Sequence, residues 1–200
     1  MDPAGLQIAV LVILVLLSAF FSGTETAFTS FNKNHMKTLA QDGNKKAQAV
    51  LNIEERYEKF LVTMLIGNNI VNISASAIST LLFTEFLRDD AWHRIDRQSN
   101  LNRYSENIGA LYADLGATVS TIVMTIIILI FGEITPKNLG KDFAESYAMS
   151  VSGIVRLLML VFTPLTAIFS LWRVLLSKVF KSKAALSITE DEIMTMVEEA

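Results

Sequence analysis

The stretch that decides the fold is Gly116-Ala-Thr-Val-Ser-Thr-Ile-Val-Met-Thr-Ile-Ile-Ile-Leu-Ile-Phe-Gly132, which is followed by Glu133 and, three residues later, by Pro136. An uncharged run of this length is typical of a helix that crosses a membrane. A carboxylate at its end is costly in lipid and usually faces protein or water. Because proline removes a backbone donor and clashes with the preceding turn, we expect a broken helix at Gly132-Pro136, an arrangement from which transporters build ion sites. Alternatively, Gly132 ends the span and Glu133 lies in headgroup water.

The composition indicates a membrane protein. Of the 200 residues, 52% are hydrophobic and 18% charged, and the mean hydropathy is +0.42, which is too apolar for an ordinary soluble domain. The absence of cysteine excludes disulfides, zinc–thiolate sites and nucleophilic thiols, and two histidines leave little for a histidine metal site. The sequence has no basic stripe with interleaved aromatics, no nucleophile–base pair and no cofactor motif. We therefore expect neither a nucleic-acid partner nor an enzyme.

Three uncharged apolar runs predict three membrane spans, each near or above the roughly 18–20 residues that a crossing needs. The first could be a cleaved signal peptide, but it lacks a basic n-region and its apolar part is long, so we expect a retained span. The predicted fold is an all-α integral membrane protein with three transmembrane helices plus juxtamembrane amphipathic helices. The spans are expected at about 5–25, 60–84 and 115–135, and the juxtamembrane helices at about 32–58 and 142–181.

The transmembrane domain is expected to cover residues 1–183. Between the first two spans we expect two amphipathic helices separated at Asp42-Gly43-Asn44, and we expect the polar stretch 88–107 to be an outer loop. Residues 184–200 begin like the acidic helix of a cytosolic linker, with Thr189 and Glu192 at the spacing of a capping box. We expect the chain to be the front part of a longer protein.

The placement of lysine and arginine predicts the orientation. None precedes the first span, residues 26–59 contain six, residues 85–114 contain four, and seven lie beyond Gly132. With three crossings, this distribution predicts a multi-pass protein of the plasma or inner membrane with its N-terminus outside and its C-terminus in the cytoplasm.

A fourth apolar stretch, 146–172, differs from the other three. Arg156 interrupts it, Pro164 divides it, and several basic residues follow it. One further crossing would put the basic tail outside. We therefore expect two helices that meet near Pro164 and lie at the inner face, where amphipathic elements with basic flanks are stable. An ordinary fourth span is the alternative.

The second span is unusually polar, since Gly67 is followed by Asn68, Asn69, Asn72 and two serines. Asn68 and Asn72 are four residues apart and share a helix face, which Ala75 continues. Amide oxygens on successive turns can coordinate a hard cation. The alternative is that these side chains form hydrogen bonds between helices, as polar residues often do in membrane bundles.

The first span ends in a similar polar, glycine-containing segment. Ser22 offers a hydroxyl, Gly23 permits a close approach or a local break, and Glu25 adds a second carboxylate, although this segment could simply mark the inner boundary of the span. All three spans thus carry such an interruption, and together they supply oxygen ligands without nitrogen or sulfur. Hard oxygen ligands favour Mg²⁺, Ca²⁺ or Na⁺ over zinc or copper.

Four motifs resemble those of the CorC/CorB and cyclin M (CNNM) magnesium transport proteins, in the same order and across most of residues 15–145. They are Phe21-Ser22-Gly23-Thr24-Glu25-Thr26-Ala27, Gly43-Asn44-Lys45-Lys46-Ala47, Leu65-Ile66-Gly67-Asn68-Asn69-Ile70-Val71-Asn72 and Gly132-Glu133-Ile134-Thr135-Pro136-Lys137. The resemblance implies a homodimer in the lipid membrane and a dehydrated Mg²⁺ in an inward-facing cavity of each subunit. It also implies cytosolic CBS domains, which are missing from this chain.

By position, the resemblance implies Ser22, Asn68, Asn72 and Glu133 as the Mg²⁺ ligands. The supporting residues would be Gly23, Glu25, Gly67, Asn69, Ala75, Gly132, Ile134, Pro136 and Lys137. Family activity implies Mg²⁺ export with Na⁺ as a coupling ion. A non-transporting membrane scaffold or regulator that senses Mg²⁺ is the alternative, and the sequence alone leaves it open.

Overall fold

The computed structural model describes residues 3–95 and 102–169, and all of its regular structure is helical. The chain divides into two units, residues 1–160 and 161–200, which we treat separately. The first unit contains nearly all the described elements. They are α1 (Pro3–Ser30), α2 (Lys33–Gln41), α3 (Lys45–Glu54), α4 (Tyr57–Ile95), α5 (Asn102–Ile127), the π-helix η1 (Ile128–Ile134), α6 (Thr135–Asp142) and α7 (Ala144–Val161).

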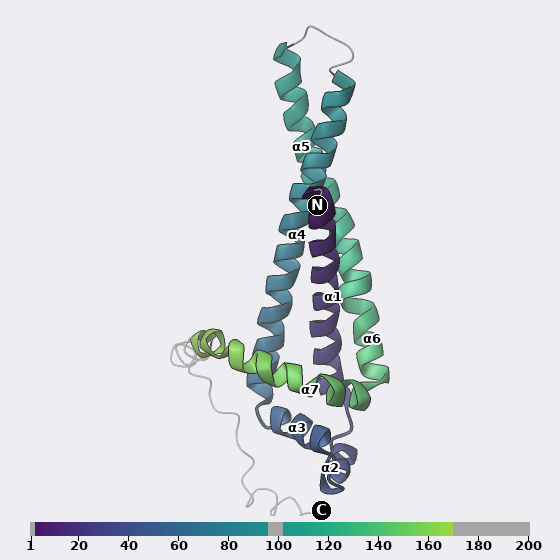
Figure 1. Cartoon of the computed structure of the whole chain (residues 1–200), viewed down its shortest axis with the longest axis vertical. Helices are drawn as coiled ribbons and strands as arrows, with labels where there is room; N and C mark the ends of the chain where they lie inside the picture. The colour runs from purple at the N-terminus through teal and green to yellow at the C-terminus, as the bar shows by residue number, and fades with distance from the viewer. Residues whose placement is uncertain (1–2, 96–101, 170–200) are drawn as a thin grey trace, which may run out of the picture. The chain divides into compact units, whose positions relative to one another are not determined.

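The long helices α1 and α4 and the continuous segment α5–η1–α6 run side by side (Figure 1). Helix α1 contacts α4, η1 and α6, and α4 also contacts α5. Large apolar side chains are exposed along all three, for example Leu16, Ile73 and Ile122. Because water would disfavour so much exposed apolar surface, this bundle suits a lipid environment. The prediction of an all-α integral membrane protein is confirmed.

One more helix than predicted has the length and composition of a membrane span. Four helices in the described part of the chain qualify: Ala4–Ser30, Tyr57–Phe86, Asp114–Asp142 and Ala144–Val161. The last is α7, for which we predicted a juxtamembrane position. Figure 1 shows α7 running across the long helices rather than along them, and its buried residues Ala148 and Val155 join the same apolar core as Phe60. Part of its apolar character therefore serves packing within the first unit.

The two amphipathic helices expected between the first two spans are present as α2 and α3. Asn32 caps α2 and Asn44 caps α3, each accepting two backbone N–H bonds at its side-chain oxygen. Gly43 joins them with a φ of +89°, a conformation that costs a side-chain-bearing residue more than glycine. This explains the Gly43-Asn44 pair as a turn and a cap. Ala47 is fully buried in the core.

The outer loop that we predicted at 88–107 is wrong in extent, because α4 continues to Ile95 and α5 begins at Asn102. The stretch contains neither glycine nor proline. Its charged and amide residues are compatible with a helix, so polarity alone did not mark a loop.

The polar segments predicted to interrupt the three spans behave differently from one another. Helix α1 is continuous through Ser22-Gly23, and α4 is continuous through Gly67-Asn68. The third helix changes to π geometry at Ile128–Ile134, where the Thr135 N–H bonds the Ile130 carbonyl, and Pro136 then lies in the first turn of α6. A proline fits there because first-turn N–H groups need no helical partner. The irregularity expected at Gly132-Pro136 is thus a widened helix rather than a break.

In the second unit, residues 163–169 are helical after a turn at Phe162. This agrees with the expected helix boundary near Pro164. The prediction of an acidic linker helix at 184–200, including Thr189 and Glu192, lies outside the described residues.

Candidate functional site

The centre of the site is a contact between α4 and the π-helix. The Asn72 Nδ2 atom donates to Oε1 of Glu133 at 3.5 Å, a long hydrogen bond. The other amide atom, Asn72 Oδ1, is buried and accepts no hydrogen bond from the described residues. Because π-helical turns are rare and frequently occur at functional sites, the position of Glu133 within η1 is itself informative.

Helix α1 contributes Ser22, which is fully buried. Its hydroxyl has no hydrogen-bond partner among the described residues, whereas its backbone carbonyl accepts a bond from Thr26 Oγ1 at 3.0 Å. Buried polar atoms are nearly always paired in proteins, so each exception requires an explanation. Two more such atoms occur in the described part of the chain, Gln7 Oε1 and Thr24 Oγ1.

Asn68 lies one turn before Asn72 on α4 and contacts Ser18, which lies one turn before Ser22 on α1. The Ser18 hydroxyl donates to Asn68 Oδ1 at 3.2 Å, and Ser18 is buried. Ser18 was not among the residues predicted from the sequence. A signal existed, because it is a lone polar residue four positions before Ser22 and therefore on the same helix face.

Glycines allow α1 to approach η1 and α6 closely. A Cβ atom on Gly132 would lie 2.8 Å from the Ser18 hydroxyl oxygen, and a Cβ atom on Gly140 would overlap the Gly23 carbonyl oxygen. A Cβ atom on Gly23 would lie 3.2 Å from the Pro136 carbonyl oxygen. Gly140, which the sequence analysis did not single out, therefore pairs with Gly23.

The remaining predicted residues fall into two groups. Gly67 packs against the Phe21 ring and Ala75 is buried, while Glu25 and Pro136 are half-buried. In contrast, the side chains of Asn69, Ile134 and Lys137 are exposed. Asn69 donates to the Leu65 carbonyl of its own helix at 2.9 Å, a local bond that does not join it to α1 or η1.

The site offers oxygen atoms from a carboxylate, amides and a hydroxyl. Among the described residues there is no group of three or more His, Cys, Asp or Glu side chains that could hold a metal ion, and neither Glu133 nor Glu25 forms an ion pair there. A cation would therefore rest on one main carboxylate and neutral oxygens. Such a set suits a hard cation that must also be released.

The fold and this polar centre define a multi-pass helical membrane protein with an oxygen-lined site between its long helices. The chain belongs to the cyclin M transmembrane N-terminal domain family, whose model matches residues 9–200. This confirms the predicted family.

Curated relatives agree with this assignment. The chain is 30% identical to a UPF0053 protein of Haemophilus influenzae over 99% of its length, and 27% identical to the UPF0053 inner membrane protein YfjD of Escherichia coli over 92%. It is 30% identical to the polyamine export protein of E. coli K12 over 96%. The chain covers 42%, 38% and 41% of these relatives, respectively, so it spans about two fifths of their length.

Proposed function

We propose that this domain transports Mg²⁺ and binds the dehydrated ion between α1, α4 and η1, with Ser22, Asn68, Asn72 and Glu133 as oxygen ligands. The observation that carries the proposal is the contact of Asn72 with the Glu133 carboxylate, in which Asn72 Oδ1 is buried without a partner, together with the buried, unpartnered Ser22 Oγ on α1, a helix that contacts both α4 and η1. Unpaired buried oxygens are costly unless a ligand satisfies them, and Mg²⁺ prefers oxygen ligands at short distance.

The ligands differ in what they must do when the ion binds. Asn72 already presents a free oxygen, and its amide nitrogen orients the carboxylate of Glu133. Asn68 Oδ1 accepts from Ser18, a hydroxyl that can rotate away to free this oxygen or coordinate the ion itself. A single full charge with neutral oxygens offsets the Mg²⁺ charge only in part, which permits release to either side.

The wider proposal places the protein in a plasma or inner membrane with its N-terminus outside and its C-terminus in the cytoplasm. It functions as a homodimer that exports Mg²⁺ with Na⁺ entry as the coupling reaction, under control of CBS domains in the longer protein. Support comes from the positive charge on 26–59 and beyond Gly132 and from membership of the cyclin M family.

A second candidate is polyamine export, favoured by three relatives that are named polyamine export protein. The Glu133 carboxylate and the amide oxygens can accept hydrogen bonds from an ammonium group. A polyamine carries several such groups along its length, however, whereas the described site has one main carboxylate. Mg²⁺ carries its whole charge at one point, so it fits a site with one main carboxylate better than a polyamine does.

Thermal unfolding of the purified protein with increasing Mg²⁺, Ca²⁺, Na⁺ or spermidine tests the site. A ligand that binds the folded state raises Tm with concentration. We expect Mg²⁺ to raise Tm in the native chain and to have no effect in Glu133→Gln. Glu85→Gln removes the same charge from an exposed position on α4 and should respond like the native chain. An equal Mg²⁺ response in Glu133→Gln would exclude this site.

Flux through vesicles that contain the full-length protein separates the functions. Mg²⁺ movement that Glu133→Gln abolishes supports transport, and spermidine movement without Mg²⁺ movement supports the polyamine candidate. Mg²⁺ binding without any flux would favour the non-transporting sensor.

A further inference from the structure

A cavity of about 590 Å³ lies away from the proposed ion site, between the turn that joins α3 to α4 and one face of α7. All of its lining residues belong to the first unit. They are Asn52, Ile53, Glu55, Arg56, Lys59, Gly153, Arg156, Leu157, Met159 and Leu160.

The polar part of the cavity wall is mainly cationic. Arg56, Lys59 and Arg156 face it, against the single acidic side chain of Glu55. Arg56 and Arg156 are exposed, and within residues 3–95 and 102–169 neither forms an ion pair. The three basic groups come from segments about 100 residues apart and converge on one space, so the cavity favours an anion.

On α7, the cavity is lined by a face that carries Arg156 within an otherwise apolar stretch. One face of α7, which includes Val151, Val155 and Met159, is buried in the core. The residues that line the cavity at positions 153, 156, 157 and 160 follow the i, i+3, i+4, i+7 spacing of another face. On that face Leu157 and Leu160 are 60% and 70% exposed beside Arg156. Packing within the described chain therefore accounts for neither the arginine nor these leucines.

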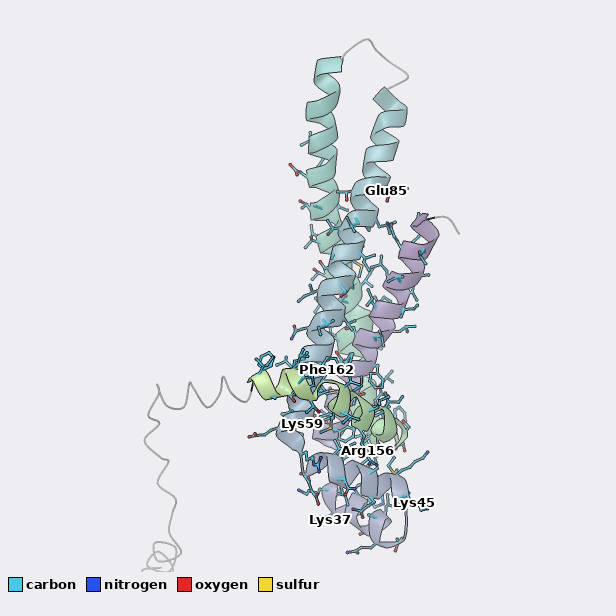
Figure 2. All side chains as sticks on the ribbon, turned by 60° about the vertical axis from the view of Figure 1, so that its left-hand side comes forward. Lys37, Lys45, Lys59, Glu85, Arg156 and Phe162 are labelled. Carbon is cyan, nitrogen blue, oxygen red and sulfur yellow. The ribbon has the colours of Figure 1, made fainter. Side chains whose placement is uncertain are left out.

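The cavity lies at the end of the second predicted span, where a membrane interface is expected. Lys59 directly precedes Phe60, where the uncharged run of the second predicted span begins. A basic side chain at that position lies near the headgroups, and exposed leucines next to it point to acyl chains. Figure 2 shows the side chains on the ribbon and labels Lys59 and Arg156.

We propose that this cavity binds an anionic phospholipid, with its phosphate held by Arg56, Arg156 and Lys59 and its acyl chains against Leu157 and Leu160. Guanidinium groups bind phosphate oxygens in a bidentate manner, and basic pockets at the cytoplasmic side of membrane helices bind anionic headgroups. A free phosphate shares the headgroup chemistry but has nothing to cover the leucines. A zwitterionic lipid brings a cation of its own next to the arginines. The bound lipid joins the α3–α4 turn to α7.

Native mass spectrometry and thermal unfolding of the intact protein in detergent test the proposal, with phosphatidylglycerol, phosphatidylcholine or inorganic phosphate added. The native chain should retain phosphatidylglycerol and gain Tm from it, with little response to phosphatidylcholine or phosphate. The double variant R56Q/R156Q should bind phosphatidylglycerol at least tenfold more weakly. Lys37→Gln with Lys45→Gln removes the same charge from exposed positions outside the cavity and should leave binding unchanged (Figure 2).

Leu160→Gln provides a second variant that keeps the basic groups and removes apolar contact, and it should also weaken phosphatidylglycerol binding. Equal binding of phosphatidylcholine and phosphatidylglycerol would overturn the proposal, as would equal binding by the native chain and R56Q/R156Q. An equal Tm gain from inorganic phosphate would assign the cavity to a soluble anion and also overturn the lipid.

Discussion

Two polar contacts lie between the long helices, and they differ in whether their atoms are satisfied. Ser79 of α4 and Ser120 of α5 are both buried, and their hydroxyls lie 2.9 Å apart in a hydrogen bond. In the second contact, between Asn72 of α4 and Glu133 of η1, the buried Asn72 Oδ1 has no partner in the described part of the chain, and the same is true of the buried Ser22 Oγ on α1. The first contact joins two helices, whereas the second leaves oxygens available for a ligand.

In a membrane bundle, polar side chains that bond to one another and hold helices together differ from polar side chains whose atoms are left for a ligand. A serine pair of this kind needs no further ligand, because either hydroxyl can donate to the other. An unsatisfied cluster beside a carboxylate is unfavourable on its own and becomes favourable when a cation arrives. Variants that affect one contact and not the other therefore test the assignment.

The largest expected difference is between two asparagines of α4. Asn72→Ala removes a proposed oxygen ligand and the amide that donates to Glu133, so we expect Mg²⁺ affinity to fall roughly 10–100-fold, the size seen when groups that orient metal ligands are removed. Asn69→Ala makes the same change at an exposed position bonded to its own helix, and Mg²⁺ affinity should stay unchanged. Titration calorimetry measures both. Equal losses in the two variants would mean that the site does not lie where we propose.

The next largest effect concerns the close contact of η1 with α1. Gly132→Ala puts a Cβ atom against the Ser18 hydroxyl, so the free energy of unfolding should fall by about 1–2 kcal/mol, and Mg²⁺ affinity should fall with it. Gly153→Ala has open space at its Cβ position on α7 and should raise the free energy of unfolding by roughly 0.5–1 kcal/mol. Denaturant titration in detergent compares them. A stable Gly132→Ala variant with native affinity would contradict the tight fit.

The smallest expected effects concern two serines: Ser79, whose hydroxyl has a hydrogen-bond partner, and Ser22, whose hydroxyl has none among the described residues. Ser79→Ala leaves the Ser120 hydroxyl buried without its partner, which should lower the free energy of unfolding by about 1 kcal/mol and leave Mg²⁺ affinity unchanged. Ser22→Ala removes a buried hydroxyl without a partner, so the free energy of unfolding without ions should stay the same or rise, while Mg²⁺ affinity should fall. Unfolding curves with and without Mg²⁺ give both quantities. Lower Mg²⁺ affinity in Ser79→Ala, with native Mg²⁺ affinity and a lower free energy of unfolding in Ser22→Ala, would contradict both assignments.

Much of the fold followed from the sequence because hydropathy and charge dictate it. The three long apolar runs and the α2–α3 pair around Asp42-Gly43-Asn44 have strong local signals, in length for the spans and in capping and turn residues for the pair. The loop predicted at 88–107 was too long, because a polar sequence without glycine or proline can stay helical, as it does up to Ile95 and again from Asn102. The π-helix could not be distinguished from a break, because both begin from the same glycine and proline signals.

The candidate site was only partly accessible from the sequence. Asn72 and Glu133 meet as the motifs led us to expect, but which asparagines face inward depends on helix rotation. Helical spacing put Asn68 and Asn72 on one face and Asn69 on another, but only the structure shows that Asn69 is the exposed one. Ser18 and Gly140 became visible only through contacts between helices, Ser18 with Asn68 and Gly140 with Gly23. Such pairings join residues about 50 and 117 positions apart, and no local pattern predicts them.

The most direct test of the central claim is to locate the ion. Mn²⁺ takes the same hard oxygen ligands as Mg²⁺ and gives an anomalous X-ray signal, so crystals of the protein grown with Mn²⁺ would show its position. We predict an anomalous peak between α1, α4 and η1, in contact with Ser22, Asn72 and Glu133, that disappears when Mg²⁺ is added in excess. A peak elsewhere, with none beside Glu133, would contradict the account.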